Sequence, residues 1–532
     1  MSDLAALAAR LEKLEREQSE LRESLGDAEQ ARDEYRQLYL DMMERCRKLE
    51  RGLLGQKAEK LPPSEKQLSL SVLEAVLGHR VDPIDVEPTH VESHARRKPT
   101  GRKPLPDHLP RVEFELVPLE VQREGLDAFE RIGEEVTEVL ERRPASMIVA
   151  KIIKPKYVRR DRDRNGKTTV LVGSTPALPI ARCLAGPGML ADTIVRRWQD
   201  HLPLNRLQDI YGREGVEVAR STICGWHEQL VPIVAPLIAA MRQDAFDQPY
   251  LCTDATGVLV QAKEKCRTGH FWVLVAPGRA VLFEFTHKHD SSAVDEVLAG
   301  YEGYLVADAH AVYDHLYESG NTVEVNCWAH CRRYFFKALA AEPDDAREAL
   351  GLIGALFKVE RSIATAPRKK REKIRAKHSK PIVDRFFSWC DAKWPRLLEN
   401  TPIYDGVRYA RNQRIGLSRF LEDGRLPIHN NQSELHLRRQ AVGRKNWLFI
   451  GSDDGAAANT TFTSLLATCR MHRVEPWSYL RDLLCLIPTW PAHRMLELAP
   501  INWAVTRALP EVQHALETNV YRALTLLEDG AP

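Results

Sequence analysis

Residues 250–261 read YLCTDATGVLVQ, an apolar, β-rich run that predicts a buried strand. The rest of the chain is interpreted outward from this stretch. Turn residues separate it from further apolar runs, and one short helical pattern begins at a pair of serines. The expected elements are strands at 269–277 and 280–287, a helix at 291–300, and strands at 303–308 and 322–330.

Three meandering strands, a helix and further alternating strands give the element order of an RNase H-like fold. Asp254 falls on the first, central strand, and Asp308 ends the fourth, GYLVAD. If these strands are neighbours, both carboxylates lie at one end of the sheet. The predicted fold class is therefore multidomain α/β, with an RNase H-like catalytic core.

A third carboxylate, Glu434, follows in PIHNNQSELHLRR, just inside an expected helix. Like charges gathered in one place repel unless a cation neutralises them, and carboxylate oxygens suit Mg²⁺, with Mn²⁺ as a substitute. Two such metals stabilise both the attacking and the leaving oxygen of a displacement at phosphorus. We therefore predict Asp254, Asp308 and Glu434 as catalytic metal ligands of an enzyme that cuts or joins nucleic acid.

Several residues near these carboxylates are candidates for supporting roles. Asn430 and Asn431 could order water or substrate, and they could equally cap the helix. His330 lies in CWAHCRR with Cys327 and Cys331, where core cysteines with a positioning histidine are favoured over zinc. Arg438 could clamp a phosphate or pair with Glu434 one helical turn away. The remaining candidates are Arg439, Arg444 and Lys445, which could hold DNA, and Trp447, which could stack on a base or belong to the core.

Two stretches ahead of this core are candidates for DNA binding. Residues 188–241 follow the helix, glycine-containing turn, helix pattern, with Ser221 expected to cap the second helix. Residues 111–180 read as short strands with a basic patch, or as an exposed charged hairpin. The predicted contacts are Arg220, Ser221, Thr222 and His227 in the first stretch and Lys154, Lys156, Arg159 and Arg160 in the second. Many helical pairs share the first outline without touching DNA.

The N-terminal residues 1–54 repeat apolar side chains every seven positions, from Leu7 to Leu49. This period predicts a self-associating coiled coil, and the alternative is a single amphipathic helix packed on its own domain. Residues 55–110 are rich in proline and basic side chains and predict a linker. Its basic cluster, Arg96, Arg97, Lys98, Arg102 and Lys103, could hold phosphates or belong to a solvated tether.

Composition limits the other possibilities. The chain has 532 residues and a net charge of +2, which predicts several domains and excludes a uniformly basic coat. Ten cysteines without close pairs predict reduced thiols in a cytosolic protein. We expect no signal peptide and no membrane-spanning segment. The expected domains are 1–54 coiled coil, 55–110 linker, 111–180 β-rich module, 181–248 helix-turn-helix, 249–336 core, 337–405 basic helical insertion, 406–455 second part of the core, and 456–532 helical region.

Several long motifs of this chain resemble the transposases of the insertion sequence 66 family. The matching stretches are HLPLNRLQDIYGREGVEVARSTICGWHEQL, YLCTDATGV, YLVADAHAVYDHLY, NCWAHCRRYFF and HNNQSELHLRRQAVGRKNWLFIGSDDGA. The resemblance covers nearly the whole chain, and Asp254, Asp308 and Glu434 fall on the family's three acidic positions. It implies a Mg²⁺-dependent DDE transposase that recognises terminal inverted repeats, multimerises to pair two ends, and works with small accessory proteins.

The chain departs from this family in one module. Family members often carry two cysteine pairs that bind zinc before the helix-turn-helix, and the matching stretches here have no cysteine. Zinc is therefore not expected. Two rival functions stay open: an RNase H-like nuclease without strand transfer, and a non-catalytic DNA-binding regulator derived from a transposase.

Overall fold

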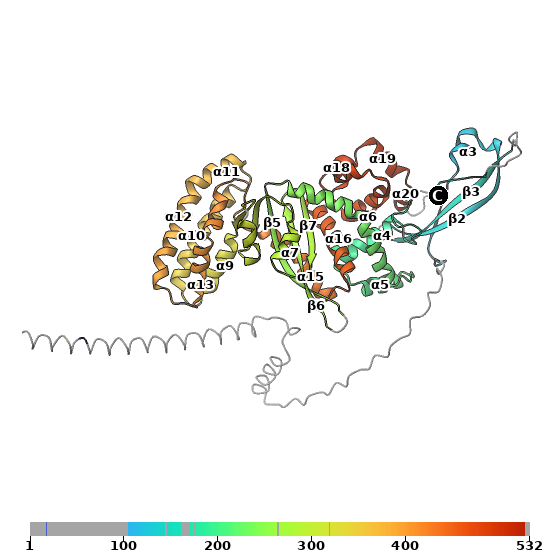
Figure 1. Ribbon diagram of the computed structural model, residues 1–532. Helices are drawn as coiled ribbons and strands as arrows, with labels where there is room; N and C mark the ends of the chain where they lie inside the picture. The colour runs from blue at the N-terminus through green and yellow to red at the C-terminus, as the bar shows by residue number, and fades with distance from the viewer. Residues whose placement is uncertain are drawn as a thin grey trace, which may run out of the picture. The chain divides into compact units, whose positions relative to one another are not determined.

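The computed structural model describes Gln18 and residues 105–526, except 144–145, 161–169, 175–176, 263–264 and 319. The coiled coil predicted for 1–54 and the basic cluster of the predicted linker lie outside the described residues, apart from Gln18. Within them the chain is mixed α/β, with two sheets and many helices (Figure 1).

A five-stranded sheet forms around the stretch that begins at Tyr250. Its strands are β5 (Tyr250–Val260), β6 (Arg267–Ala276), β7 (Ala280–Thr286), β8 (Gly303–Ala307) and β9 (Thr322–Asn326), in the order β7-β6-β5-β8-β9. β5, β6 and β7 pair antiparallel, whereas β8 pairs parallel with both β5 and β9. The predicted strands are present, but the last one ends at Asn326. The helix α9 (Trp328–Ala338) begins where a strand was expected to continue to His330.

Alternating side chains of this sheet enter two separate hydrophobic cores. Leu251 and Leu305 belong to one core, and their neighbours Cys252 and Val306 belong to the other. The first core includes the helices α6 (Arg220–Phe246), α16 (Asp453–Met471) and α17 (Pro476–Leu486); the second includes α9, α10 (Pro343–Ser362), α12 (Lys380–Lys393) and α13 (Pro402–Asn412). The sheet is thus covered on both faces, as the period-2 pattern of a fully buried strand requires.

The basic run 368–380 lies within this helical region, and one of its residues, Arg375, is buried and holds the surrounding chain together. The run contains α11 (Arg368–Ile374) and a π-helical turn that begins at Arg375. The fully buried guanidinium of Arg375 donates to the carbonyl oxygens of Phe420, Asp423 and Leu426 at 2.6, 3.0 and 2.8 Å. It also pairs with the carboxylate of Glu360 at 2.7 Å. Arg375 therefore ties the insertion to the chain that leads to Glu434.

The small β-rich module contains one strand that the sequence did not predict. Its elements are β1 (Arg111–Glu115), α3 (Leu119–Glu124), β2 (Phe129–Arg143), β3 (Ser146–Arg159) and β4 (Val170–Val172). β2 pairs antiparallel with β3 along its length, with a bulge at Gly133. Its sequence, FERIGEEVTEVLERR, was not read as a strand because it is mostly charged. The charged side chains of its first half, Glu130, Arg131, Glu134 and Glu135, are exposed, which an edge strand tolerates, whereas Glu141 and Arg142 near its end are buried.

The C-terminal helices close over this module and over the first core. Val520, Tyr521 and Leu524 of α20 (Val520–Leu526) pack with Val139 and Ile148 of the β-rich module. The remaining described helices are α4 (Pro187–Ile194), α5 (Leu204–Arg213), α7 (Ser291–Val297), α8 (Asp314–Glu318), α14 (Arg414–Ser418), α15 (Asn431–Trp447), α18 (Trp503–Thr506) and α19 (Pro510–Glu517).

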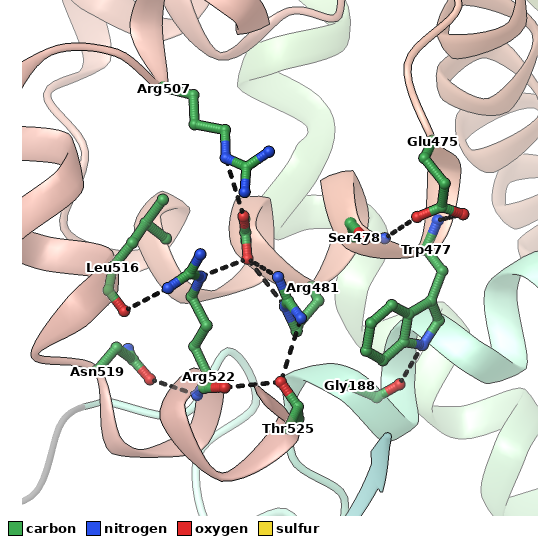
Figure 2. A network of polar contacts seen from close by, with 11 residues as sticks. Gly188, Glu475, Trp477, Ser478, Arg481, Arg507, Leu516, Asn519, Arg522 and Thr525 are labelled. Carbon is green, nitrogen blue, oxygen red and sulfur yellow. Dashed lines mark hydrogen bonds and ion pairs between the residues drawn. The ribbon is translucent and has the colours of Figure 1, made fainter. Parts of the chain in front are cut away.

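A buried carboxylate holds the C-terminal helices together. Figure 2 shows Arg481, Arg507 and Arg522 directed at one carboxylate, which belongs to Asp482 of α17. The Arg481 Nη2 and Arg522 Nε atoms lie 2.7 and 3.0 Å from its Oδ1 atom. A buried charge with several donors is stabilised where a lone charge would not be.

The helix α6 meets the length and composition criterion of a membrane-spanning helix, which corrects the expectation that no segment approaches it. A core helix of a globular protein passes the same test. Here Ile223, Leu230 and Leu237 of α6 are fully buried in the first core.

Candidate functional site

Asp254 and Asp308 are aligned on two neighbouring strands, Asp254 within β5 and Asp308 just after the end of β8. The parallel register pairs Cys252 of β5 with Val306 of β8. Asp254 and Asp308 each follow two residues after this pair, so they lie next to each other across the two chain segments. Asp308 directly follows the last residue of β8, Ala307. Both carboxylates are half-buried. The strand order therefore places the two side chains as the sequence predicted.

Asn430 anchors the start of α15 to β5 beside Asp254. The Asn430 side-chain amide donates to the Thr253 carbonyl oxygen at 2.7 Å, and its Oδ1 atom accepts from the Ser433 hydroxyl at 2.8 Å. The Asn430 backbone N–H donates to the Cys327 Sγ atom at 3.1 Å. Asn430 is fully buried, whereas Asn431 is exposed. Asn430 thus fixes where the first turn of α15, and with it Glu434, meets the sheet.

Glu434 is held by two groups of α9. Its Oε1 atom accepts a hydrogen bond from Arg333 Nη2 at 3.1 Å and lies 3.4 Å from His330 Nε2. Burial is the main cause that lowers the pKa of His330; Arg333 adds to it, and the negative charges of Asp308 and Glu434 oppose it. The predicted partner Arg438, one turn further along α15, is exposed and makes no described ion pair with Glu434.

The electrostatics of Asp254 couple the three carboxylates. Burial, together with the negative charges of Asp308 and Glu434, raises the pKa of Asp254 to about 7. The Ala255 N–H, which donates to Asp254 Oδ1 at 2.8 Å, and the Arg333 guanidinium act in the opposite direction. The effect of burial and of the two other carboxylates on the pKa of Asp254 is thus larger than that of the nearby Arg333 cation.

Among the described residues, no group of three or more His, Cys, Asp or Glu side chains is arranged so that it could hold a metal ion. The donor chemistry nevertheless fits a divalent cation, because oxygen ligands carry uncompensated negative charge at Asp254. In this arrangement the carboxylate of Glu434 already contacts Arg333 and His330. A cation could therefore be held by all three carboxylates only after Glu434 exchanges these partners.

The cysteines beside His330 face the interior. Cys327 and Cys331 are fully buried, and burial raises the pKa of each thiol above its ordinary value. Cys331 belongs to the second hydrophobic core, whereas the Cys327 sulfur accepts the Asn430 N–H. The two thiols and the imidazole of His330 thus contact different groups.

The two helices expected in the predicted helix-turn-helix are α5 and α6, but α6 differs from the prediction in its start and in the face it exposes. α6 begins at Arg220 with Ala219 as its N-cap, so the expected capping role of Ser221 is wrong. Arg220, Ser221 and Thr222 are exposed on its first turn. His227 is 2% exposed, and its Nε2 atom contacts the Thr193 hydroxyl at 3.0 Å. The prediction that His227 faces DNA is therefore wrong, because this face of α6 packs into the core.

The basic residues of the β-rich module have acidic or carbonyl partners nearby. Lys154 and Lys156 both pair with Glu135, each at 3.1 Å. Arg159 pairs with Glu124, and Arg160 Nε donates to the Phe129 carbonyl oxygen at 3.0 Å. Cross-strand pairing therefore offsets much of the positive charge that was predicted to form a patch.

The basic residues near the end of α15 fall into two groups. Arg438 and Lys445 are exposed and stay candidates for DNA contact. Arg439 is 8% exposed and donates to Gln199 Oε1 at 2.7 Å, so it is held within the fold and not on the open surface that the prediction assumed. Arg444 donates to Thr256 Oγ1 at 2.9 Å and holds α15 against β5.

Trp447 completes the contact of α15 with the far end of β5. Its ring is buried with Val258, Val260 and Ile450. The guanidinium of Arg197 lies over the same ring, 5.6 Å from its centroid. The sequence did not single out Arg197, although its neighbour Trp198 in VRRWQ offered the same mixture of basic and aromatic residues that was noted at Trp447.

Three models of protein families match the chain. The model described as "Transposase IS66 family" matches residues 182–458, more than half of the chain, and includes all three carboxylates. The model "IS66 C-terminal element" matches residues 464–501. The model "Transposase C of IS166 homeodomain" matches residues 41–114, across parts of the predicted coiled coil and linker.

Several curated proteins of Sinorhizobium fredii are similar to the chain along most of their length. Uncharacterized protein y4hP is 29% identical over 491 residues, which covers 86% of this chain and 87% of that protein. Uncharacterized protein y4qI is 30% identical over 429 residues, with coverages of 77% and 78%. Uncharacterized protein y4jD is 24% identical over 493 residues, with coverages of 88% and 95%.

Proposed function

Because this chain belongs to the IS66 family of transposases, we propose that it cuts and joins the ends of an insertion sequence by metal-dependent DDE phosphoryl transfer. The observation that carries the proposal is the electrostatic coupling of Asp254 with Asp308 and Glu434. Three acidic side chains from remote stretches influence one another at one end of a sheet. A protein that only binds DNA has no need of such repulsion.

The catalytic core in this proposal is RNase H-like. Its support is the strand order β7-β6-β5-β8-β9, with three antiparallel strands followed by two parallel ones. Asp254 within the central strand and Asp308 directly after its parallel neighbour are the two strand positions that such a core uses for its acidic residues. Glu434 lies in the first turn of a helix that Asn430 ties to β5 at Thr253.

In the reaction, a water oxygen forms a bond to the phosphorus at the element end. The bond from phosphorus to the 3′ oxygen breaks and leaves a free 3′-hydroxyl, which then attacks a phosphodiester of target DNA in the same way. Mg²⁺, or Mn²⁺ in its place, would be held by Asp254, Asp308 and Glu434 and would supply charge neutralisation at the reacting oxygens.

The chain's own residues prepare this site. Asp254 carries a proton for part of the time near pH 7, and a bound cation would displace it. Arg333 and His330 hold Glu434 in the arrangement described here. Asn430 fixes the start of α15 on Thr253, so the position of Glu434 along β5 is set by a buried hydrogen bond.

DNA recognition would use more than one part of the chain. The homeodomain-like match at 41–114 and the exposed first turn of α6, with Arg220, Ser221 and Thr222, both support contacts with terminal inverted repeats. Pairing of two ends requires a multimer, for which the predicted coiled coil of 1–54 is the candidate. Small accessory proteins of the same element are further expected partners.

The test is cleavage of terminal-repeat DNA by Asp254→Ala in Mg²⁺. We expect loss of strand cleavage with DNA binding largely retained, and Asp209→Ala, an exposed aspartate of α5, serves as the matched control. Nicking by Asp254→Ala at the unaltered rate would refute the assignment. A strand-transfer assay separates a transposase from a nuclease with the same core, and the absence of any cleavage by the unaltered chain would favour a regulator.

A further inference from the structure

A groove of about 450 Å³ lies away from the three carboxylates, none of which lines it. Its walls come from the π-helical segment η2 (Val195–Gln199), the starts of α5 and α6, and the loop 446–452 after α15. The rings of Trp198, Trp447 and Phe449 contribute to these walls. The groove is therefore aromatic, and it opens between the predicted DNA-binding helices and the catalytic core.

Arg197, which lines the groove, is a buried charge without a described ion pair. It is 9% exposed, and its guanidinium lies over the rings of Trp198 and Trp447, with 4.6 and 5.6 Å to the centroids. Its Nη1 atom donates to the Leu202 carbonyl oxygen at 3.3 Å, whereas its buried Nε atom has no partner. A buried cation left unpaired in this way is costly, and an anionic ligand would offset that cost.

The rim of the groove carries two exposed apolar side chains. Leu448 is 65% exposed and Phe449 is 41% exposed. Leu448 has a φ angle of +63°, a left-handed conformation that is unfavourable for a leucine. The loop holds this conformation because Ile450 is hydrogen-bonded to β5 through Leu259 and Gln261, at 2.8 and 2.7 Å. A rigid, strained loop thus presents two apolar side chains to solvent.

The charge of the lining matches a polyanion. Arg206 and Arg220 are exposed and line the groove together with Arg197, and Glu228 is the acidic residue among the lining groups. Phosphates attract arginines, and aromatic or apolar side chains accept a base that has left its stack. Charge and aromatic surface together fit a nucleotide better than a peptide or a lipid.

The groove is also within reach of a strand bound at the carboxylates. α15 connects the two places, since Glu434 lies in its first turn and Trp447 is its last residue. With a rise of about 1.5 Å per residue this separation is about 20 Å. A DNA duplex covers that distance in about six base-pair steps.

We propose that this groove binds an unpaired nucleotide of the DNA end, with its base stacked on Phe449 and its phosphates held by Arg197 and Arg206. The proposal rests on the proposed function in one respect, because it takes DNA as the substrate. It does not depend on the carboxylates or on a metal ion.

The experiment compares the binding of two DNA probes to the full chain in EDTA, where metal-dependent cleavage is suppressed. One probe is a blunt duplex, and the other is the same duplex with a short unpaired thymidine tail. The unaltered chain should bind the tailed probe about tenfold more tightly, since stacking of one base contributes about 1–3 kcal/mol. The variants Phe449→Ala and Arg197→Met should bind both probes equally.

The matched control is Ile415→Ala, another strongly exposed apolar residue, on α14, which should keep the preference. Arg197→Met removes an unpaired buried charge and should unfold at the same or a higher denaturant concentration; if it fails to fold, Phe449→Ala decides alone. An unchanged tail preference in Phe449→Ala, or no preference in the unaltered chain, would overturn the proposal. Asp254→Ala should keep the preference for the tailed probe. The binding experiment therefore does not depend on whether the carboxylates are catalytic, which the cleavage assay tests.

Discussion

Replacing Asp254 by asparagine should stabilise the metal-free protein, and more so at high pH. Burial and the charges of Asp308 and Glu434 raise the pKa of Asp254 to about 7 in the folded chain, against an ordinary value of 3.8. The folded state therefore binds more protons than the unfolded state between these values, and stability falls as pH rises through that window. Asparagine has nearly the same shape and carries no charge, so it removes the loss of folding stability that the ionised Asp254 causes.

The magnitude follows from proton linkage. At pH 5 the raised pKa destabilises the folded chain by about 1.7 kcal/mol, and at pH 8 by about 4.3 kcal/mol. These values are upper limits, because part of the carboxylate faces water. We therefore expect the stability gain of Asp254→Asn to be up to about 2.6 kcal/mol larger at pH 8 than at pH 5.

The assay is guanidinium unfolding of the unaltered chain and of Asp254→Asn in EDTA at both pH values. Asp209→Asn, at an exposed aspartate of α5, serves as the control and should give a pH-independent difference near zero. Adding Mg²⁺ at pH 8 should stabilise the unaltered chain and leave Asp254→Asn unaffected. An equal stability gain at pH 5 and pH 8 would show that Asp254 has an ordinary pKa and would refute the reasoning.

Two further predictions concern arginines whose roles the structure separates. Arg333→Met removes a cation that lowers the pKa of Asp254, so the pH midpoint of DNA cleavage should rise. A pH–rate profile measures this midpoint. A midpoint that stays the same or falls would contradict the assigned coupling between Arg333 and Asp254. Arg375→Met leaves three carbonyl oxygens without their buried donor and leaves Glu360 with Arg371 as its remaining partner, so it should destabilise the chain by about 3–5 kcal/mol in guanidinium unfolding. The exposed neighbour Lys369→Met should change stability by less than about 0.5 kcal/mol. Similar values for these two variants would contradict the structural role of Arg375.

Local pattern predicted the elements that surround the site. Apolar alternation in YLCTDATGVLVQ and in GYLVAD gave β5 and β8, because a strand buried between two cores needs apolar side chains on both faces. It failed at β2, where most glutamates face solvent although Glu141 is buried, and at the end of β9, where the backbone turns into α9 at Trp328. The spacing of apolar residues does not reveal an exposed strand, and it does not show at which residue a helix begins.

The site was predicted less completely than its strands. Residue type and motif singled out Asp254, Asp308 and Glu434, but sequence could not tell that Arg333 and His330 hold Glu434. His227 and Arg439 were assigned to DNA because they are polar and lie on suitable helices, and both are buried. One side of a helix is distinguished from the other only by what packs against it.

The sequence by itself determined the strands, most helices and the three acidic residues, since these depend on residue type and on spacing along the chain. The tertiary structure alone decided which charges meet. Strand order brings Asp254 beside Asp308, Asn430 fixes the start of α15 on β5, and packing buries Arg197 between two tryptophan rings. The physical reason is that electrostatic coupling and burial depend on distances between residues remote in sequence, and only the packed chain sets those distances.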